Sequence, residues 1–233
     1  MWTYRTRTLV STAALLGAAC FFMPVGAAEY FVNKQGRDTN DGSSRATAFQ
    51  TIQQGIDAMQ AGDTLSIGPG EYTENVRVAD LGDPHEQTVI RAGIPGTVVV
   101  RGDRDAEVDF KKVGGSRFTW VADWDKQVLS VREVDTLRKL KPAANTKSLD
   151  YSPGRYFHDE RKSRLYVSST DFRPADHHFY AVATRKGHGF HVTNSERIVF
   201  EGVAARGFAT PEGKWELTYP VSGFMLRDSE DCV

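Results

Sequence analysis

Four histidines in the second half of the chain have the side chains best suited to metal or acid–base chemistry: His177, His178, His188 and His191. Two ligands on one face of a strand need even spacing, because successive side chains of a strand point to opposite faces. The two pairs are one and three residues apart, so neither pair shares a face of a regular strand. The pattern predicts no metal site and no cofactor-binding motif here.

Two loops carry patterns that resemble ligand sites. The loop GRDTNDGSS at 36–44 has Asp38, Asn40 and Asp41 spaced like the oxygen ligands of a calcium loop. The same side chains also bond to turn backbone, and no Glu follows at EF-hand spacing, so the turn interpretation is preferred and no metal site is predicted. The segment GFATPEGK at 207–214 is one residue too long between its glycines for a phosphate-binding loop and lacks the following Ser or Thr, so it is interpreted as a plain loop.

The elements that must position any site begin in the stretch 49–76, FQTIQQGIDAMQAGDTLSIGPGEYTENV. Its apolar residues at helical spacing lie on one face: Ile52, Ile56 and Met59. Thr51 has capping-box spacing to Gln54, and Gly62 stands where a left-handed residue would end the helix. A short amphipathic helix before many strands predicts a lid over the open first layer of a stack of strands.

Short strands with glycine-rich or polar turns surround this helix. The expected strands are Glu29–Asn33, Thr64–Ile67, Tyr72–Val78, Thr88–Ala92 and Thr97–Arg101. Because no helices separate them, a doubly wound α/β sheet is excluded. The 24 positions from Thr64 to Thr88 match one coil of a solenoid, whose repeats run to roughly 20–30 residues.

The N-terminus has the pattern of a secretory signal peptide over residues 1–27. Arg5 and Arg7 precede an apolar run, and small residues follow at a cleavage site near Ala27. Cleavage removes both arginines and no acidic residue, which changes the formal net charge from −1 to −3, so nucleic acid is an unexpected partner. It also leaves Cys232 as the one thiol, so we expect a secreted or periplasmic protein without an internal disulfide and without a membrane span in the mature chain.

The order of motifs over residues 30–102 resembles that of secreted right-handed parallel β-helix proteins of the pectate-lyase-like superfamily. The matching segments are YFVNKQGRDTNDGSS, AFQTIQQGIDAMQAGDTLSIGPGEYTENV and TVIRAGIPGTVVVRG. The resemblance implies an all-β fold, a right-handed parallel β-helix with an N-terminal capping helix. It does not specify the chemistry, because the superfamily includes polysaccharide lyases, glycoside hydrolases and proteins of no known activity.

Aromatic and charged residues crowd the segment that follows, which resembles a small β insertion found in some β-helix glycosidases and lyases. Its aromatic residues are Trp120, Trp124, Tyr151, Tyr156, Phe157 and Tyr166. They either fill a small core or stack against sugar rings. The segments Arg155–Asp159 and Arg164–Val167 are expected to form a hairpin whose turn is 160–163.

An internal repeat closes the sequence. Residues 189–199, GFHVTNSERIV, match residues 223–233, GFMLRDSEDCV, at an offset of 34. We interpret them as consecutive coils separated by a loop around 210–218. The expected organisation is therefore a signal peptide at 1–27, a cap and first coils at 29–105, a β-rich insertion at 106–186, and further coils at 187–233. Because Val233 falls inside an expected strand, we expect the sequence to be a piece of a longer solenoid that is a monomer when complete.

The resemblance implies a carbohydrate-active protein, a polysaccharide lyase or a glycoside hydrolase, that acts on an acidic or plant-type polysaccharide. A lyase needs a base, Lys or Arg in the resembling families, and often calcium, whereas a hydrolase needs two carboxylates. The residues that carry these roles lie on later coils in those families, so the catalytic residues stay unknown. Arg185, Lys186, His188 and Glu201 lie on or beside coils and are possible candidates, but solvated surface charge is the preferred interpretation of each. A non-enzymatic carbohydrate-binding or cell-surface protein is the alternative.

Overall fold

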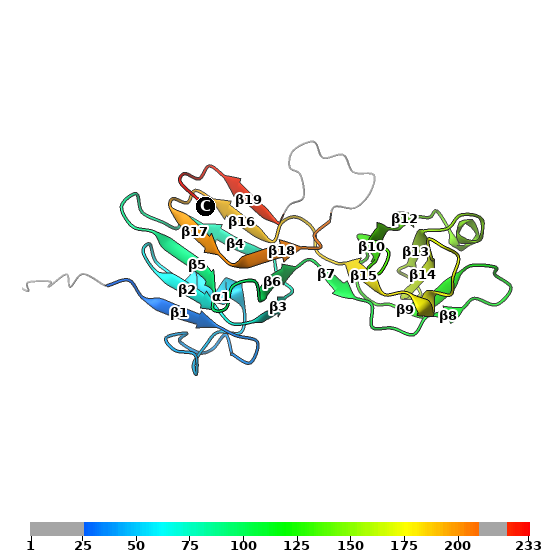
Figure 1. The fold of residues 1–233 in the computed structure, drawn as a ribbon, viewed down its shortest axis with the longest axis horizontal. Helices are drawn as coiled ribbons and strands as arrows, with labels where there is room; N and C mark the ends of the chain where they lie inside the picture. Colours follow the sequence, from blue (N-terminus) through cyan, green and yellow to red (C-terminus); the bar gives the residue numbers. More distant parts are fainter. Residues whose placement is uncertain (1–25, 210–222) are drawn as a thin grey trace, which may run out of the picture.

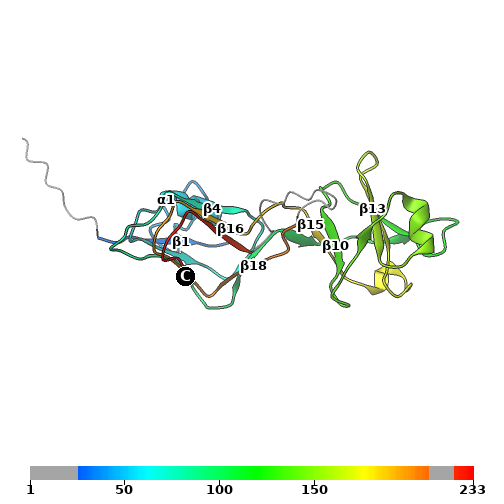
Figure 2. The ribbon, with the colours of Figure 1, turned by 90° about the horizontal axis from the view of Figure 1, so that it is seen from above.

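The computed structural model describes residues 26–209 and 223–233. Strands predominate, as predicted for an all-β protein, and they form two bodies at opposite ends of an elongated molecule (Figures 1 and 2). Most of the predicted signal peptide and the predicted loop at 210–218 lie outside the described residues. Among the described helices, none is long and apolar enough to cross a membrane.

The first body, here called the parallel body, contains three parallel sheets. One has the order β1-β2-β5-β17, with bounds Glu29–Val32, Thr64–Ile67, Thr88–Ala92 and Ile198–Glu201. The second has the order β3-β6-β18, with bounds Gly70–Tyr72, Val98–Arg101 and Val203–Arg206. The third has the order β4-β16-β19, with bounds Val76–Ala79, Phe190–Thr193 and Phe224–Arg227.

The chain visits these three sheets in a fixed cyclic order. Strands β2, β3 and β4 lie in three different sheets, and β5, β6 and β16, then β17, β18 and β19, return to the same sheets in the same order. The internal repeat is confirmed, because Phe190 pairs with Phe224 and Thr193 with Arg227 in parallel register. The rings of the two phenylalanines are stacked, with centroids 4.9 Å apart. Like residues therefore stack upon like residues from one round of the chain to the next.

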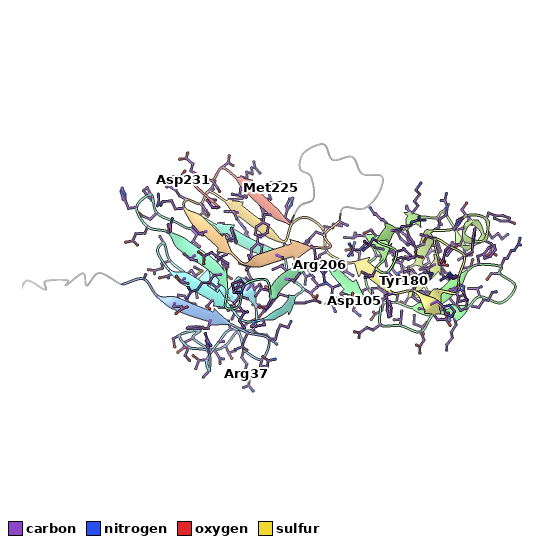
Figure 3. The ribbon with its side chains drawn as sticks, in the orientation of Figure 1. Arg37, Asp105, Tyr180, Arg206, Met225 and Asp231 are labelled. Carbon is purple, nitrogen blue, oxygen red and sulfur yellow. The ribbon has the colours of Figure 1, made fainter. Side chains whose placement is uncertain are left out.

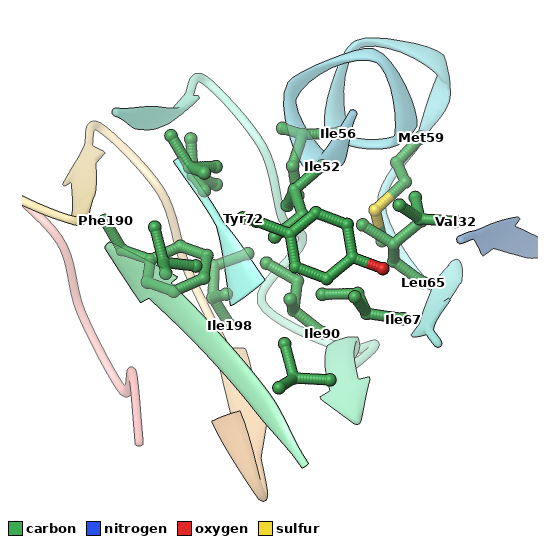
Figure 4. Close-up of a cluster of buried hydrophobic side chains, with 14 of the residues drawn as sticks. Val32, Ile52, Ile56, Met59, Leu65, Ile67, Tyr72, Ile90, Phe190 and Ile198 are labelled. Atoms are coloured by element: carbon green, nitrogen blue, oxygen red, sulfur yellow. The ribbon is translucent and has the colours of Figure 1, made fainter. Parts of the chain in front are cut away.

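Helix α1, Ile52–Ala58, covers the apolar interior of the first round. Thr51 is its N-cap, as predicted, and accepts a hydrogen bond from the Gln54 N–H at 3.2 Å. Figure 4 shows Ile52, Ile56 and Met59 directed from this segment toward the interior, where they are buried against Val32, Leu65 and other aliphatic side chains. The helix packs on β1, β2 and β4, which agrees with its expected role as a lid.

The predicted end of this helix was wrong. Gly62 does not end it: the helix stops at Ala58, and Met59 has extended backbone angles. The buried Asp63 carboxylate explains the early stop, because its two oxygens accept the backbone N–H groups of Gln60 and Ala28, each at 2.7 Å. Gly62, at a φ of +86°, instead occupies the tight turn that leads into β2.

The predicted strand Tyr72–Val78 was also wrong, because it is two strands, β3 and β4, in different sheets. Between them the chain bends at 73–75, where two polar side chains bond to distant backbone. The Glu74 carboxylate accepts the first free N–H groups of α1, those of Ile52 and Gln53, both at 3.1 Å. Asn75 donates to the carbonyls of Lys186 and His188, both at 2.8 Å. A straight strand would lose these bonds.

The second body, here called the antiparallel body, lies between β6 and β16 in the chain. Its sheets have the orders β11-β10-β15-β7 and β12-β13-β14-β9-β8. The bounds are Asp103–Asp105 (β7), Lys111–Lys112 (β8), Trp120–Asp123 (β9), Ser130–Glu133 (β10), Arg138–Lys139 (β11), Lys141–Pro142 (β12), Arg155–Asp159 (β13), Arg164–Ser168 (β14) and Tyr180–Ala183 (β15). Two 3₁₀ helices, Thr146–Tyr151 and Ala175–His177, complete it. The predicted hairpin is confirmed as β13 and β14, paired antiparallel.

The antiparallel body has its own apolar core, separate from that of the parallel body. Of the aromatic residues singled out in the sequence, Trp124, Tyr156 and Tyr166 are buried, and Trp120 packs against this core. Tyr166 and the partly buried Phe157 lie outside this core, with ring centroids 6.2 Å apart, and Tyr151 leaves 86% of its surface exposed. Core packing therefore explains three of these six aromatic residues, Trp120, Trp124 and Tyr156.

Replacing Ile56 with Asp should unfold or aggregate the protein, because the change removes a buried aliphatic side chain and buries a charge beneath the lid. We expect a loss of about 3–5 kcal/mol in the free energy of unfolding, measured by chemical denaturation. Asp57→Ala on the exposed side of the same helix is the matched control and should cost about 1 kcal/mol or less. A soluble Ile56→Asp protein of unchanged stability would contradict the lid.

Candidate functional site

A buried guanidinium joins the two bodies. The Arg101 side chain, at the end of β6, is only 6% exposed. It donates to the carboxylates of Glu71 on β3, Asp103 on β7 at 2.8 Å, and Asp105 on β7 at 2.8 and 3.1 Å. Figure 3 places Asp105 between the two bodies. Because the planar fork of Arg binds several carboxylates at once, this residue fixes the direction in which the chain leaves the parallel body.

Two further arginines extend this cluster. Arg206 on β18 donates to Glu71 at 2.9 Å, and Arg132 on β10 donates to the buried Asp103 carboxylate at 3.2 Å. Each carboxylate at the centre thus has a cationic partner. The hydrogen bond from Arg101 is the main cause that lowers the pKa of Asp105, which therefore stays ionised over a wide pH range.

A cavity of about 850 Å³, here called the aromatic cavity, opens beside this cluster. Acidic, aromatic and aliphatic side chains line it: Asp105, Ala106, Glu107, Val108, Asp109, Phe110, Val134, Ala175, Asp176, His178, Phe179 and Tyr180. Tyr180 packs its ring edge to face against Phe110, with centroids 5.1 Å apart. Phe179 leaves 76% of its surface exposed. An apolar wall with a few polar groups is typical of pockets for small organic ligands.

A second cavity of about 380 Å³, here called the junction cavity, adjoins the first. It is lined by residues of both bodies: Glu71, Thr73, Arg101, Asp103, Arg104, Asp105, Glu107, Val108, Asp123, Trp124, Asp125 and Lys126. Asp105, Glu107 and Val108 line both cavities. The end of β7 and the residues just after it therefore border both cavities.

His178 bridges two carboxylates at the rim of the aromatic cavity. Its Nδ1 lies 2.7 Å from Asp135 and its Nε2 lies 3.0 Å from Asp171, and the imidazole is only 4% exposed. Burial alone would lower the pKa of His178, but the two carboxylates and the nearby Glu133 raise it above its ordinary value. Burial would raise the pKa of Asp135 and Asp171, but hydrogen bonds from His178 and from backbone N–H groups lower it.

Two polar side chains near His178, those of Glu133 and Tyr180, are buried. Glu133 is fully buried and accepts hydrogen bonds from Thr170 N–H at 2.8 Å and from the hydroxyls of Thr136 and Thr170. Tyr180 is 2% exposed, and its hydroxyl has no hydrogen-bond partner among the described residues. Burial, followed by the charges of Glu133 and Asp135, raises the pKa of Tyr180, so the phenol stays protonated.

The residues offered from the sequence lie elsewhere. Arg185, Lys186 and His188 lie in the segment that returns to β16, where Arg185 donates to the Asn75 side-chain oxygen at 3.3 Å. Glu201 is the last residue of β17, in the sheet β1-β2-β5-β17, and it pairs in register with Arg91 on β5. The structure does not bring Glu201 together with the other three, and none of the four lines the aromatic or the junction cavity.

The remaining candidates have structural partners. Asp38 accepts the N–H groups of Gln50 and Thr51 at 2.8 Å, and Asp41 accepts that of Ser43 at 3.0 Å, so their oxygens bond to turn backbone. The rings of His188 and His191 lie 5.6 Å apart. Within the described ranges, no group of three or more His, Cys, Asp or Glu side chains is arranged to hold a metal ion.

Sequence reasoning missed Arg101, and it named His178 among four histidines without finding its carboxylate partners. A signal for Arg101 was visible, since RGDRD at 101–105 places Arg101, Asp103 and Asp105 at alternate positions, on one face of an extended chain. No local signal pairs His178 with Asp135, because the two residues are 43 positions apart in the chain.

Comparison with known proteins bears on the fold. No protein-family model matches the chain, and no curated protein sequence matches it. A solved structure described as the complex of XylC with xylose is similar at a TM-score of 0.53 and 14% identity, over 76% of this chain and 36% of that chain. One described as a glycoside hydrolase is similar at a TM-score of 0.56 and 14% identity, over 78% of this chain and 51% of that chain. This chain thus spans about a third and about half of their lengths, and the likeness concerns the fold.

The contribution of His178 to the stability of the fold should change with pH in a definite direction. A histidine whose pKa is raised by folding stabilises the protein below its unfolded pKa, about 6.5, and this contribution is lost as the pH rises through the folded value. The carboxylates of Asp135 and Asp171, whose pKa is lowered, contribute above about pH 4 and lose their contribution as the pH falls through their folded values. The ion pairs of His178 with Asp135 and Asp171, here called the His178 clamp, therefore stabilise the protein most between about pH 4 and pH 6.5.

We expect His178→Gln to lower the melting temperature more at pH 5.5 than at pH 8.5, measured by thermal denaturation in matched buffers. His177→Gln, at the exposed neighbouring position, is the control and should leave the pH profile unchanged. An equal loss at both pH values would contradict a charged clamp.

Arg101→Met should cost about 3–5 kcal/mol in the free energy of unfolding, because it leaves the buried Asp103 carboxylate with one of its two cationic partners. Arg91→Met breaks an ion pair of similar length, 2.7 Å to Glu29, whose side chains are both exposed. This control should cost about 1 kcal/mol or less in the same denaturation experiment. Equal effects of the two substitutions would show that the junction cluster has no special structural role.

Proposed function

We propose that the protein is an exported carbohydrate-active protein built on a right-handed parallel β-helix, and that it cleaves a polysaccharide as a glycoside hydrolase. The cyclic order of three parallel sheets supports the β-helix, with residues 29–105 and 187–233 as its coils and residues 106–186 as an insertion. Two structures of the same fold support the carbohydrate ligand: one is described as bound to xylose and the other as a glycoside hydrolase. The N-terminal sequence supports export to a secreted or periplasmic location.

The cleft formed by the aromatic and junction cavities is the observation that carries the proposal. Sugar rings bind through apolar C–H faces against aromatic side chains and through hydroxyl groups that bond to carboxylates. Phe179, backed by the buried rings of Phe110 and Tyr180, supplies the first kind of surface, and the acidic residues at and after the end of β7 supply the second. Because the two cavities share an edge, a chain of several sugar units fits across both.

Asp105 and Glu107 at this shared edge are the proposed catalytic pair. Hydrolysis of a glycosidic bond needs one ionised carboxylate and one carboxylic acid on opposite sides of the bond. Arg101 keeps Asp105 ionised, which suits the base or nucleophile, and Glu107 is then the acid. Asp105 is the last residue of β7 and Glu107 lies just beyond it. Along a strand, side chains two residues apart are about 6–7 Å apart, close to the separation in inverting enzymes.

Incubation with a polysaccharide panel tests this function. We expect release of reducing ends from at least one of xylan, chitosan, pectate and alginate, without the ultraviolet absorbance of an unsaturated uronate. Asp105→Asn and Glu107→Gln should each lower kcat about 100-fold or more while binding of the polysaccharide persists. Glu160→Gln, in the exposed turn between β13 and β14, is the control and should keep full activity.

Other outcomes identify the alternatives. Appearance of unsaturated uronate, with loss on addition of a chelator, would favour a calcium-dependent lyase over a hydrolase. Binding without any bond cleavage would favour a non-enzymatic carbohydrate-binding protein. The absence of binding to every polysaccharide of the panel would contradict a carbohydrate function altogether.

A further inference from the structure

The aromatic cavity carries charge of one sign. Four carboxylates line it, those of Asp105, Glu107, Asp109 and Asp176, and neither Lys nor Arg lines it. A ligand that enters this cavity therefore meets a negative potential, which low-dielectric aromatic walls strengthen.

Most of this charge is not neutralised within the protein. Asp105 is paired with Arg101. By contrast, no side chain in the described part of the protein forms a hydrogen bond or an ion pair with Glu107, Asp109 or Asp176, all of them exposed. With Glu107 as the proposed acid, the carboxylates of Asp109 and Asp176 remain available to a cationic ligand.

The imidazole at the rim does not reverse this charge. Both ring nitrogens of His178 are bonded to carboxylates, Asp135 at 2.7 Å and Asp171 at 3.0 Å. A charged His178 is therefore outnumbered by its own two partners. Its N–H groups are directed to these partners and are not available to an anionic sugar.

One further feature of the cavity suits a sugar ring. Phe179 and Val134 expose apolar surface beside it, and Phe179 is the more exposed of the two. An apolar platform, together with free carboxylates, fits a ring that has a hydrophobic face and a positive charge.

We propose that the aromatic cavity selects amino sugars with a protonated amine, such as glucosamine units, and rejects uronic acids. The inference rests on the carbohydrate function proposed above and gives its substrate class. An ammonium group gains charge-assisted hydrogen bonds from Asp109 and Asp176, whereas the carboxylate of a uronate in this cavity meets like charges without a cationic partner. This differs from the acidic polysaccharide that the sequence resemblance suggested.

Three oligosaccharides of equal length test the proposal: a glucosamine tetramer, its N-acetylated counterpart, which is neutral, and a galacturonate tetramer. Dissociation constants are measured by calorimetry at about pH 5.5, where carboxylates are ionised and the glucosamine amine is protonated. We expect the glucosamine tetramer to bind about tenfold more tightly than the galacturonate tetramer, with the N-acetylated tetramer between them. The preference should shrink as sodium chloride is raised from about 50 mM to about 500 mM.

Asp109→Asn and Asp176→Asn locate the effect in the cavity. Each should weaken binding of the glucosamine tetramer about twofold to fivefold and leave binding of the N-acetylated tetramer unchanged. Glu160→Gln removes an exposed carboxylate outside the cavity and serves as the control for net charge. Equal weakening by all three substitutions would contradict the cavity as the source of selectivity.

Failure of this inference can be told apart from failure of the proposed function. Tighter binding of the neutral or the galacturonate tetramer would overturn the amino-sugar preference and leave the carbohydrate function standing. If none of the three tetramers and no polysaccharide of the panel binds, both proposals fail.

Discussion

The ion pairs of Arg101 are the interaction on which the arrangement of the two bodies depends. The chain leaves the parallel body directly after this residue, and two of its three carboxylate partners, Asp103 and Asp105, belong to the first strand of the antiparallel body. Removing a guanidinium from water costs several kcal/mol, which only close, well-directed carboxylates offset. The network is therefore satisfied in one geometry of the junction, and a change in the direction of β7 would leave a buried charge without its partner.

The same network joins structure to chemistry. Asp105 is held by Arg101 on one side and lines both cavities on the other. The ion pair that aligns the bodies thus also determines where one carboxylate of the cleft lies and keeps it ionised. The His178 clamp acts at the opposite rim, where it holds the segments around Asp135 and Asp171 together. Both walls of the aromatic cavity are consequently fixed by buried charge, which favours a rigid, pre-formed site.

The parallel body has a different role. Its rounds stack Val76, Phe190 and Phe224 in register, so each round supports the next and extends the same flat surfaces. Such a stack tolerates a long insertion between two of its strands, since β6 and β16 keep their neighbours whatever the chain does between them. The cavities form where this insertion departs. The candidate site thus combines residues of the scaffold, such as Glu71 and Arg101, with residues of the insertion.

Local pattern in the sequence determined the strands and the lid helix, because alternation and helical spacing depend on near neighbours. It also determined the in-register pairing of 189–199 with 223–233, because repeated segments stack in a repeated structure. It failed at the bend between Tyr72 and Val76 and at the end of α1, where Glu74 and Asp63 bond to backbone that is distant in the chain. Most of the candidate site was decided by the tertiary structure, although the spacing of RGDRD at 101–105 already brings Arg101 near Asp103 and Asp105. His178 meets Asp135 across 43 residues and Arg101 meets Glu71 across 30, and no local pattern encodes such contacts. Folding of the insertion brings the first pair together, and the stacking of β3 on β6 brings the second.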